Sequence, residues 1–352
     1  MTRLKSKEFI IRSKLLIWYK KNKRKLPWRK LLKNNLPNPY YIMISEYMLQ
    51  QTTVGTVKIR FNNFISKWPN INALSRISEN TILSFWSGLG YYSRATNLLK
   101  AIKIVKKKFH NKIPDNFDDL ISLPGIGDYT AKAILGIAYN KPVMPIDTNI
   151  ERIIARLYGY KFPLIKIKNQ LIKKSNLFIS KNSSTNLIQA FMDYGSIVCK
   201  PKSPNCEICV IKDKCVAYKK NIQNDIPLKL ISNIKKRKKY SRAYILYNEK
   251  NEILVRKRNS KGMLASMFEV PNDNWVIDKK KLVHDKIVTN LKDKFQYKGS
   301  VKYSFSHFDL DTAVYYIKVK KKKFTNKRWI KKHNINNSGL PSVMKKIVKI
   351  VL

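Results

Sequence analysis

The sequence predicts a multidomain protein with an all-α first part and an α+β second part. Apolar residues recur at helical spacing through residues 1–222, and from residue 240 onward the pattern changes to alternation with period two. The chain has 352 residues, which is enough to bury two cores. All four cysteines fall within the helical part, so the two parts differ in chemistry as well as in pattern.

Helical periodicity marks nine segments of the first part, separated by proline, glycine or asparagine. We expect helices near residues 5–22, 40–54, 56–67, 79–86, 91–109, 116–122, 128–139, 149–158 and 186–198. The domains are expected at residues 1–222 and 240–352, joined by a basic linker over residues 223–239. In the second domain we expect a hairpin of residues 242–247 and 253–256, strands at 301–308 and 312–319, and helices at 279–291 and 343–352.

A short turn joins two of the expected helices and forms the first candidate binding site. Leu123 and Pro124 end one helix, since proline fixes φ, while Gly125 and Gly127 tolerate positive φ. The next helix begins at once, so its first N–H groups and positive dipole end can bind a DNA phosphate. Twenty residues beyond Gly127, Asp147 precedes an amphipathic segment and is expected to cap it. Taken singly, these features are also those of an ordinary turn and an ordinary cap.

The charge of the chain favours a polyanionic partner. Its 72 Lys and Arg against 22 Asp and Glu give a net charge of +50, which points to nucleic acid. A Lys-, Ile- and Asn-rich composition also fits the codon bias of an AT-rich genome, which could account for part of the excess. There is no apolar run of membrane-spanning length and no secretory signal. We expect a cytoplasmic protein, nucleoid-associated through DNA, with no membrane partner.

The cysteines indicate a metal site. Cys199, Cys206, Cys209 and Cys215 have the spacing C-x6-C-x2-C-x5-C. Four thiols this close together, in a reducing compartment, are typical of metal ligands and not of disulfides. A zinc ribbon would have two well-separated CxxC pairs, whereas this chain has one. The spacing alone therefore indicates a metal centre, for which both iron–sulfur and zinc are open.

Together these motifs resemble the helix-hairpin-helix DNA glycosylases, and further motifs narrow the resemblance to the adenine DNA glycosylase (MutY) family. These are residues 26–29 (LPWR), residues 45–52 (SEYMLQQT) and residues 88–94 (GLGYYSR). The cysteine spacing matches the 4Fe–4S loop of the endonuclease III and adenine glycosylase families. The resemblance covers nearly the whole chain. It implies a helix-hairpin-helix glycosylase domain with an iron–sulfur loop, a 4Fe–4S cluster as cofactor and duplex DNA as partner.

Two carboxylates carry the chemistry that the resemblance implies. Cleavage of a C–N glycosidic bond requires protonation of the leaving base and stabilisation of positive charge on the sugar. Glu46 lies among apolar residues, where desolvation raises the pKa of a carboxyl group and keeps it protonated. The resemblance implies that Glu46 protonates adenine and that Asp147 stabilises the sugar cation. Tyr129 and Asn149 would order the site.

The resemblance also implies which residues contact DNA after the target nucleotide is extruded from the duplex. Gln51 matches a glutamine that wedges into the base stack, and Tyr91 matches a tyrosine beside the mispaired purine. The other expected DNA-binding residues are Trp28, Arg29, Leu123, Gly125, Gly127, Ser306 and His307.

Residues 240–352 resemble the Nudix-like domain of the same family. Residues 303–311 (YSFSHFDLD) carry its F-S-H loop, which reads the 8-oxoguanine opposite adenine. The Ser306 hydroxyl can both donate and accept a hydrogen bond, as such reading requires. The glutamate-rich motif for magnesium is absent, because the corresponding segment reads DKKKLVHDKIVTNL. We therefore expect recognition without hydrolysis in this domain; a functionless Ser-His pair at a strand edge is the alternative.

Tyr129 separates two sister families. Endonuclease III-like lyases carry a lysine two residues after the second hairpin glycine, and Tyr129 offers no amine for a Schiff base there. Lys132 lies one helical turn later, so weak lyase activity is an open alternative. Thr148 stands where the adenine glycosylases commonly have glycine, and in this it resembles the lyases. We expect a monofunctional adenine DNA glycosylase that acts as a monomer on A:8-oxoguanine or A:G mispairs. A bifunctional glycosylase/lyase of the thymine-glycol type and a non-catalytic DNA-binding iron–sulfur protein are the alternatives.

Overall fold

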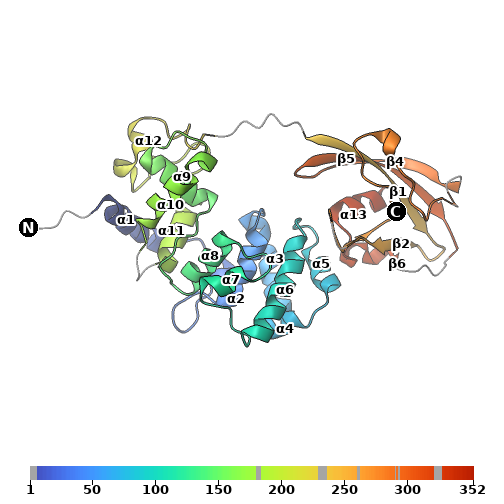
Figure 1. Cartoon of the computed structure of the whole chain (residues 1–352), viewed down its shortest axis with the longest axis horizontal. Helices are drawn as coiled ribbons and strands as arrows, with labels where there is room; N and C mark the ends of the chain where they lie inside the picture. The colour runs from blue at the N-terminus through green and yellow to red at the C-terminus, as the bar shows by residue number, and fades with distance from the viewer. Residues whose placement is uncertain are drawn as a thin grey trace, which may run out of the picture. The chain divides into compact units, whose positions relative to one another are not determined.

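The computed structural model describes residues 6–179, 184–228, 236–259, 262–289, 291, 294–320 and 327–352. The chain forms two compact units, and neither is continuous in sequence (Figure 1). The first unit comprises Met1–Arg76 and Lys100–Ser232, and the second comprises Ile77–Leu99 and Asn233–Leu352. The segment Ile77–Leu99 thus groups with the C-terminal residues, which no sequence pattern indicated. The domain division at residues 222 and 240 stays a prediction.

The first unit is helical. Its helices are α1 (Lys7–Asn22), η1 (Pro27–Arg29), α2 (Pro39–Leu49), α3 (Val54–Lys67), α4 (Ile71–Ser75), the C-terminal part of α6 (Ser93–Lys108), α7 (Phe117–Ile121), α8 (Asp128–Ala138), α9 (Thr148–Tyr158), η2 (Leu164–Ile167), α10 (Lys168–Asn176), α11 (Ser184–Ile197), η3 (Lys212–Lys214) and α12 (Val216–Lys219). The expected helices of this unit are confirmed to within a few residues. The helices α4 and α10 were not expected, because α4 is short and α10 is largely polar.

The helices that carry the candidate site residues pack closely against one another. Helix α11 packs against α1, α8 and α9. A Cβ on Gly195 of α11 would lie 2.6 Å from Cβ of Asn149, and one on Gly136 of α8 would lie 2.2 Å from Cδ1 of Ile188. Both distances are shorter than a real Cβ contact. At Gly195 the neighbouring atom is a Cβ fixed to the backbone, so only glycine permits this approach, whereas the tip of the Ile188 side chain can shift. The backbones of α8, α9 and α11 are therefore drawn together around the residues between them.

The second unit contains a mixed sheet. It comprises α5 (Glu79–Trp86), the start of α6, β1 (Arg237–Tyr247), β2 (Glu252–Lys257), β3 (Phe268–Glu269), η4 (Lys279–Lys281), β4 (Gln296–Ser304), β5 (Phe308–Lys318), β6 (Lys327–Lys331), η6 (Lys332–Asn337) and α13 (Ser342–Lys349). The strand order is β3-β2-β1-β5-β4, with β6 also paired to β2. Strands β1 and β5 are parallel, from Arg237↔Phe308 to Tyr247↔Lys318, and the other pairs are antiparallel.

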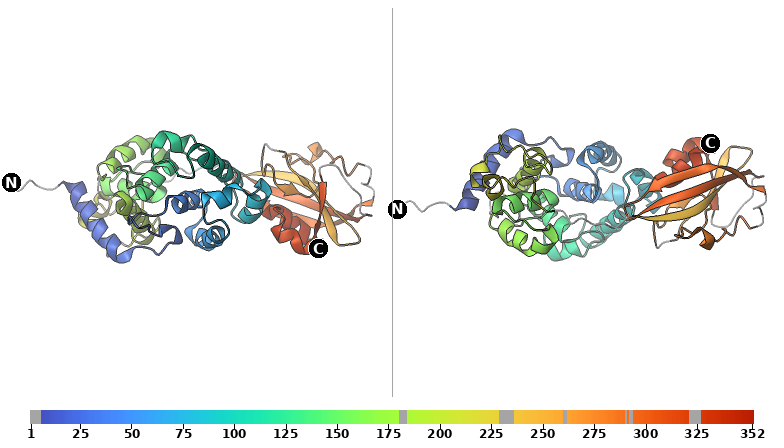
Figure 2. Two further views of the ribbon diagram at one scale, coloured as in Figure 1. Left: turned by 90° about the horizontal axis from the view of Figure 1, so that it is seen from below. Right: turned by 90° about the horizontal axis from the view of Figure 1, so that it is seen from above.

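The period of two along β1 divides the second unit into two apolar clusters. Ala243 and Ile245 point to one face of the sheet, where they pack with α13 through residues such as Met344. Tyr244 and Leu246 point to the other face and form a smaller cluster with Leu254 and Val288. In both views of Figure 2, α13 lies beside the sheet. The alternation read from the sequence therefore corresponds to a sheet covered on one side by a helix.

The expected strand pairs are confirmed, and one expected helix is wrong. Strands β1 and β2 form the predicted hairpin, and β4 pairs with β5 as predicted. Strand β1 begins at Arg237, inside the expected linker, of which residues 229–235 lie outside the described residues. Instead of a helix over residues 279–291, the described residues there form only η4 and turns. Among the described residues, no helix is long and apolar enough to cross a membrane.

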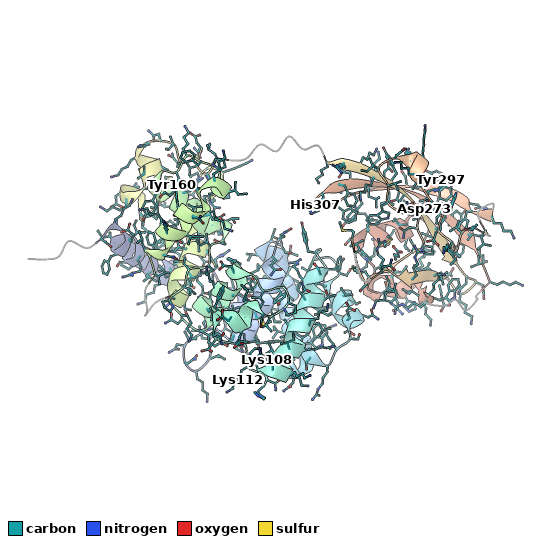
Figure 3. All side chains as sticks on the ribbon, viewed as in Figure 1. Lys108, Lys112, Tyr160, Asp273, Tyr297 and His307 are labelled. Carbon is teal, nitrogen blue, oxygen red and sulfur yellow. The ribbon has the colours of Figure 1, made fainter. Side chains whose placement is uncertain are left out.

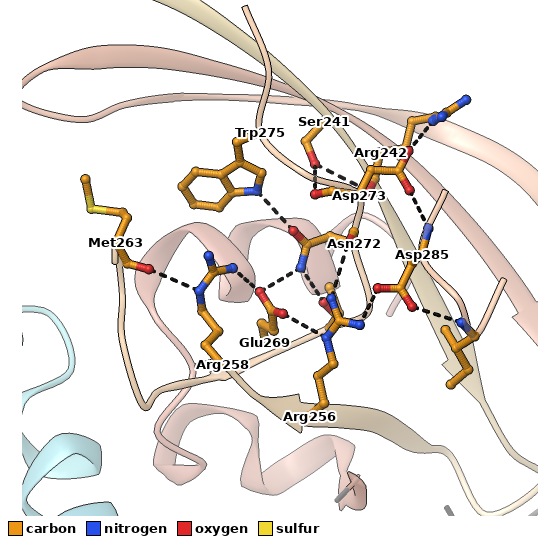
Figure 4. Close-up of polar contacts among 12 residues, drawn as sticks. Ser241, Arg242, Arg256, Arg258, Met263, Glu269, Asn272, Asp273, Trp275 and Asp285 are labelled. Atoms are coloured by element: carbon orange, nitrogen blue, oxygen red, sulfur yellow. Dashed lines mark hydrogen bonds and ion pairs between the residues drawn. The ribbon is translucent and has the colours of Figure 1, made fainter. Parts of the chain in front are cut away.

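A buried charge network explains the missing helix (Figure 4). Glu269 accepts hydrogen bonds from Arg256 and Arg258, and Asp285 binds Arg256. The backbone N–H of Asp285 also donates to Asp273 Oδ1 at 3.1 Å. These side-chain contacts draw the backbone inward at Asp285 and compete with the hydrogen bonds of a helix. Glu269 and Asp285 are thus paired with arginines of β2 and the residue after it, and these pairs fix the segment after β3 to the sheet.

Candidate functional site

The four expected catalytic side chains line one cavity in the first unit. The cavity has a volume of about 790 Å³, and Glu46, Tyr129, Asp147 and Asn149 all contribute to its wall. Glu46 comes from α2 and Tyr129 from the first turn of α8, while Asp147 and Asn149 lie at the start of α9. The structure therefore brings together residues that are separated by up to a hundred positions in sequence.

Glu46 is a buried carboxyl group. It is 6% exposed on the apolar helix α2. Burial raises the pKa of Glu46 to about 7, and the nearby Asp147 charge adds to this shift. A hydrogen bond with Tyr129 opposes the shift only in part. Glu46 can therefore hold a proton near neutral pH and release it to a bound base.

Asp147 lies in a more polar environment at the N-terminus of α9. Its side chain caps the helix by accepting from the Ile150 N–H at 2.8 Å, and its other oxygen accepts from Asn149 Nδ2 at 2.8 Å. Burial raises the pKa of Asp147, and both of these donors oppose the rise. The positive end of the helix also favours a negative charge at this position. The two carboxylates thus have environments that favour different protonation states.

Tyr129 occupies the position of the lyase lysine and faces the carboxylates. Burial and the charges of Glu46 and Asp147 raise the pKa of the Tyr129 phenol well above its usual value. The phenol therefore stays a hydrogen-bond donor. Lys132 forms an ion pair with Asp128 at 2.7 Å, and no lysine lines the cavity in the described part of the chain.

The turn between α7 and α8 is fixed by two side-chain hydrogen bonds, and part of its backbone is open to solvent. The Tyr47 hydroxyl donates to the carbonyl of Pro124 at 2.5 Å, and Gln50 Nε2 donates to the carbonyl of Gly125 at 3.3 Å. Gly125 has φ 84°, in the region that favours glycine. Gly127 has an ordinary extended backbone, and a Cβ there would meet nothing within 4 Å. Its backbone is therefore accessible to a ligand, and Leu123 is buried beneath the turn.

Two buried arginines of α9 connect Asp147 to the cysteine segment. Arg152 Nη2 donates to Asn149 Oδ1 at 2.8 Å, and its Nε donates to the carbonyl of Cys199 at 2.8 Å. Arg156 Nη1 lies 3.3 Å from Sγ of Cys199. The path from Asp147 through Asn149 and Arg152 to Cys199 consists entirely of hydrogen bonds. Sequence analysis placed both arginines on a helix without a role, although two arginines four positions apart in an apolar stretch are a detectable signal.

All four cysteines line one pocket and none forms a disulfide. Cys199, Cys206, Cys209 and Cys215 share this pocket with apolar side chains and with Tyr194. In the described part of the chain, no three His, Cys, Asp or Glu side chains are close enough to hold a metal ion together. Four thiols that line one pocket are a donor set suited to a metal centre. Arg156 supplies a cationic donor to one of the sulfurs.

The expected DNA-binding residues differ in their exposure. Trp28 is 5% exposed and packs edge-on against Phe61, so it supports the cavity wall. Arg29 also lines the cavity but binds the buried Asp193 at 2.8 Å. Gln51, by contrast, is exposed at the cavity rim with φ 55°. Such strained backbone is characteristic of functional positions.

The F-S-H loop of residues 305–307 lies in the second unit. The Ser306 hydroxyl is 2.5 Å from the Tyr91 hydroxyl, and Tyr91 has φ 44°. Phe305 packs against Phe308, with ring centroids 4.8 Å apart, which anchors the loop between β4 and β5. His307 is exposed on this loop (Figure 3). The expected reading residues Tyr91, Ser306 and His307 thus belong to one compact unit.

Gln189 is a cavity residue that sequence analysis did not identify. It lies on α11, its Nε2 donates to the carbonyl of Thr185 at 3.0 Å, and it lines the cavity with Glu46. Its Oε1 is buried with no hydrogen-bond partner in the described structure. A buried acceptor without a partner costs free energy unless a ligand supplies a donor. In the sequence Gln189 is one of several polar residues on this side of α11, with Thr185 and Asp193, so no local signal distinguished it.

Known proteins resemble the chain in both parts. A family profile described as "HhH-GPD superfamily base excision DNA repair protein" matches residues 44–174, and one described as "NUDIX domain" matches residues 242–349. An adenine DNA glycosylase from Buchnera aphidicola subsp. Schizaphis graminum (strain Sg) is 36% identical over 97% of this chain and 99% of its own length. An adenine DNA glycosylase from Schizosaccharomyces pombe is 28% identical over 94% of this chain and 86% of its own length.

Solved structures resemble the helical part. A thermostable thymine-DNA glycosylase matches with a TM-score of 0.54 and 26% identity, over 61% of this chain and 97% of that chain. A non-covalent endonuclease III–DNA complex matches with a TM-score of 0.52 and 20% identity, over 62% of this chain and 100% of that chain. The second likeness is evidence of a shared fold.

The buried Glu46 predicts a pH-dependent stability. The folded state keeps a proton between the model-compound pKa of 4.5 and about 7, whereas the unfolded state releases it, so stability falls as pH rises through this range. Glu46→Gln should therefore raise the free energy of unfolding above pH ~7 by about 3 kcal/mol, at about 1.36 kcal/mol per pKa unit, and change it little below pH ~4.5. Denaturant unfolding at both pH values measures this, with the exposed Glu207→Gln as control. An equal gain at both would contradict the assignment.

Proposed function

The chain belongs to the adenine DNA glycosylase family, a group of base-excision repair hydrolases, and on that premise we propose how its own residues act and which mispair they select. The assignment to this family rests on the full-length similarity to adenine DNA glycosylases. The single observation that carries the mechanism is the cavity in which Glu46 and Asp147 lie together in different environments. The proposal concerns A:8-oxoguanine as substrate and the role of each side chain.

Glu46 acts first as an acid. With a pKa of about 7, it holds a proton at neutral pH and transfers it to a ring nitrogen of the extruded adenine. The bond between C1′ and N9 then breaks, and its electron pair leaves with the protonated base. The resulting Glu46 carboxylate accepts a proton from water as that water adds to C1′. The proton and the electron pair are both accounted for, and Glu46 is neutral again at the end.

Asp147 stabilises the positive sugar. Its two donors, Ile150 N–H and Asn149 Nδ2, favour the ionised carboxylate, which can face the developing charge on C1′. Tyr129 donates a hydrogen bond to Glu46 and so orients its carboxyl group. Asn149 is in turn oriented by Arg152. Tyr129 and Asn149 therefore order the site without exchanging protons with the substrate.

Gln189 supplies selectivity for adenine. Its unpartnered Oε1 is an acceptor, and the exocyclic amine of adenine is a donor of the kind that this oxygen lacks. A base with a carbonyl at that position would place two acceptors together and leave both unsatisfied. The buried amide thus favours adenine over bases with a carbonyl in the same place.

Hydrolysis without lyase action is favoured over the bifunctional alternative. Tyr129 stands where a lyase has lysine, and Lys132 is paired with Asp128. The intact carboxylate pair likewise favours catalysis over the alternative of a non-catalytic DNA-binding protein. We retain the expectations that the enzyme acts as a monomer and that it is cytoplasmic, in contact with the nucleoid.

Duplex DNA binds through the α7–α8 turn and the cavity rim. The open backbone at Gly125 and Gly127 and the start of α8 provide N–H groups for a phosphate. Lys132 offsets the negative charge of Asp128 beside this position. We propose that Gln51, which lies at the cavity rim, enters the gap left by the extruded nucleotide. The net charge of +50 favours the phosphate backbone in general.

We propose that Ser306 and His307 read the base opposite adenine. 8-Oxoguanine differs from guanine by an oxygen on C8 and a hydrogen on N7. The Ser306 hydroxyl can match both changes because it donates and accepts. Tyr91, whose hydroxyl is 2.5 Å from that of Ser306, would lie beside the same base. The anchoring of Phe305 and Phe308 in the second unit gives the loop a fixed support.

The four cysteines would hold a 4Fe–4S cluster. When bound, such a cluster supplies a structural cross-link and a redox-active group. The residues of this chain hold the segment around it: Arg156 binds the carbonyls of Lys200 and Pro201, and Arg152 binds the carbonyl of Cys199. We propose that the cluster loop thereby fixes the start of α9, and Asp147 with it. Lys200, Lys202, Lys212 and Lys214 stay candidates for phosphate contacts.

Glu46→Gln should abolish most adenine release while leaving binding to the mispair intact. The amide keeps the shape of the side chain but cannot donate the acid proton, a contribution typically worth ~10²–10⁴-fold in rate. Single-turnover release of adenine from an A:8-oxoguanine duplex measures the rate, and a gel-shift titration measures binding. Near-normal release by the variant would refute the acid role. Strand breaks that appear only after alkali would separate hydrolysis from lyase action.

Purified protein should contain iron. One 4Fe–4S cluster corresponds to about four irons per chain with broad visible absorption. Cys206→Ser should lose iron and weaken DNA binding, because the loop it holds reaches Asp147 through Arg152. Lys220→Ala, an exposed change just beyond the loop, is the control and should keep both its iron and its DNA binding. One zinc and no iron by elemental analysis would overturn the cluster proposal.

The variant Ser306→Ala/His307→Ala should lose preference for A:8-oxoguanine over A:G. Loss of one net hydrogen bond of about 0.5–1.5 kcal/mol reduces the preference several-fold, whereas the rate on bound A:G should change little. Equilibrium binding and single-turnover rates on both duplexes measure this. Lys302→Ala, an exposed change on β4, is the control. Full preference in the double variant would exclude this loop as the reader.

A further inference from the structure

We infer that Arg94 is a positioning residue that fixes Tyr91 for reading the base opposite adenine. This inference deepens the proposed function, since it rests on the role proposed there for Tyr91. Arg94 is the second residue of α6 and the last residue of the 88–94 motif.

The Arg94 guanidinium binds three successive backbone carbonyls. Its Nη2 donates to the carbonyls of Leu89 and Gly90, both at 3.0 Å, and its Nε donates to the carbonyl of Tyr91 at 3.3 Å. The backbone N–H of Arg94 also donates to the Tyr91 carbonyl at 3.0 Å. A planar guanidinium has five donors in a fixed arrangement, which suits it to this task. One side chain thus defines the backbone path of the turn that presents Tyr91.

Arg94 is buried where a charge is costly. It is 6% exposed, and its guanidinium carbon lies 5.5 Å from the centre of the Trp86 ring. Burial lowers the pKa of Arg94 to about 10, so the group stays charged at neutral pH. A buried charge needs hydrogen bonds to compensate its desolvation. The three carbonyls provide them, so the cation and the turn stabilise each other.

The turn holds Tyr91 in a conformation that a non-glycine residue rarely adopts. Tyr91 has φ 44°, next to Gly90 with φ 69° and near Gly88 with φ 97°. A left-handed residue of this kind is strained and persists only where its surroundings determine it. The bonds from Arg94 to the carbonyls of residues 89–91 are contacts of this kind. They keep the Tyr91 side chain 41% exposed, with its hydroxyl 2.5 Å from Ser306.

Lysine cannot replace arginine in this role. An ammonium group on a flexible stem retains the charge but lacks the planar set of donors that spans three carbonyls. Arg94→Lys should therefore release the turn while keeping the charge of the region. If Arg94 acts through Tyr91, its loss should have no further effect when Tyr91 is already absent. That conditional effect distinguishes positioning from a general contribution to folding.

A double-mutant cycle on the full chain tests this. The readout is the ratio of affinities for A:8-oxoguanine and A:G duplexes, measured for the parent, Arg94→Lys, Tyr91→Ala and the double variant. Arg94→Lys should reduce this ratio by about tenfold, equivalent to about 1.4 kcal/mol. The double variant should match Tyr91→Ala. Amide hydrogen exchange should show faster exchange at residues 88–92 in Arg94→Lys, and the exposed Arg76→Lys is the control.

Each outcome has a distinct meaning. An unchanged ratio in Arg94→Lys, alongside a reduced ratio in Tyr91→Ala, would overturn the positioning role and leave the proposed function standing. Additive losses in the double variant would also overturn it, since Arg94 would then act independently of Tyr91. An unchanged ratio in Tyr91→Ala would instead refute the proposed reading role of Tyr91. Equal thermal unfolding of parent and Arg94→Lys would show that the loss of selectivity is not a loss of fold.

Discussion

The desolvation of Glu46 beside Asp147 is the constraint on which the rest of the site depends. Two carboxyl groups in one cavity cannot both ionise without cost, so their surroundings decide which one keeps the proton. Glu46 is surrounded by the apolar residues of α2, whereas Asp147 receives two N–H donors and the positive end of α9. The fold thereby separates an acid from an anion within one cavity.

This arrangement requires the start of α9 to be held in place. Gly195 permits α11 to approach Asn149, and Arg152 connects Asn149 to Cys199. A cysteine loop that contains no cavity residue can therefore affect catalysis through backbone and side-chain hydrogen bonds. On this view the loop contributes geometry, and a lost cluster would first be felt as a misplaced Asp147. In the second unit, the corresponding role falls to Arg94, whose hydrogen bonds hold the turn that carries Tyr91.

Much of the fold and the main site residues could be predicted from sequence, because periodicity and motif spacing are local signals. The hairpin turn, Glu46, Asp147 and the cysteines are of this kind. The helix expected over residues 279–291 was wrong because the contacts of Asp285 with Arg256 and Asp273 come from distant strands. Gln189 and Arg152 were missed for a related reason: their importance lies in what they face across the fold. The grouping of Ile77–Leu99 with the C-terminal residues likewise depends on tertiary contacts alone.

The most direct test of this account is the titration of the Glu46 carboxyl group in the full-length protein. Carbon NMR of glutamate-labelled protein would follow its signal, identified by its absence in Glu46→Gln. The account predicts a pKa of about 7, raised by burial and by the charge of Asp147. Titration at the ordinary value of a solvent-exposed glutamate, near 4.3, would show that Glu46 is ionised at neutral pH and would contradict its role as the acid.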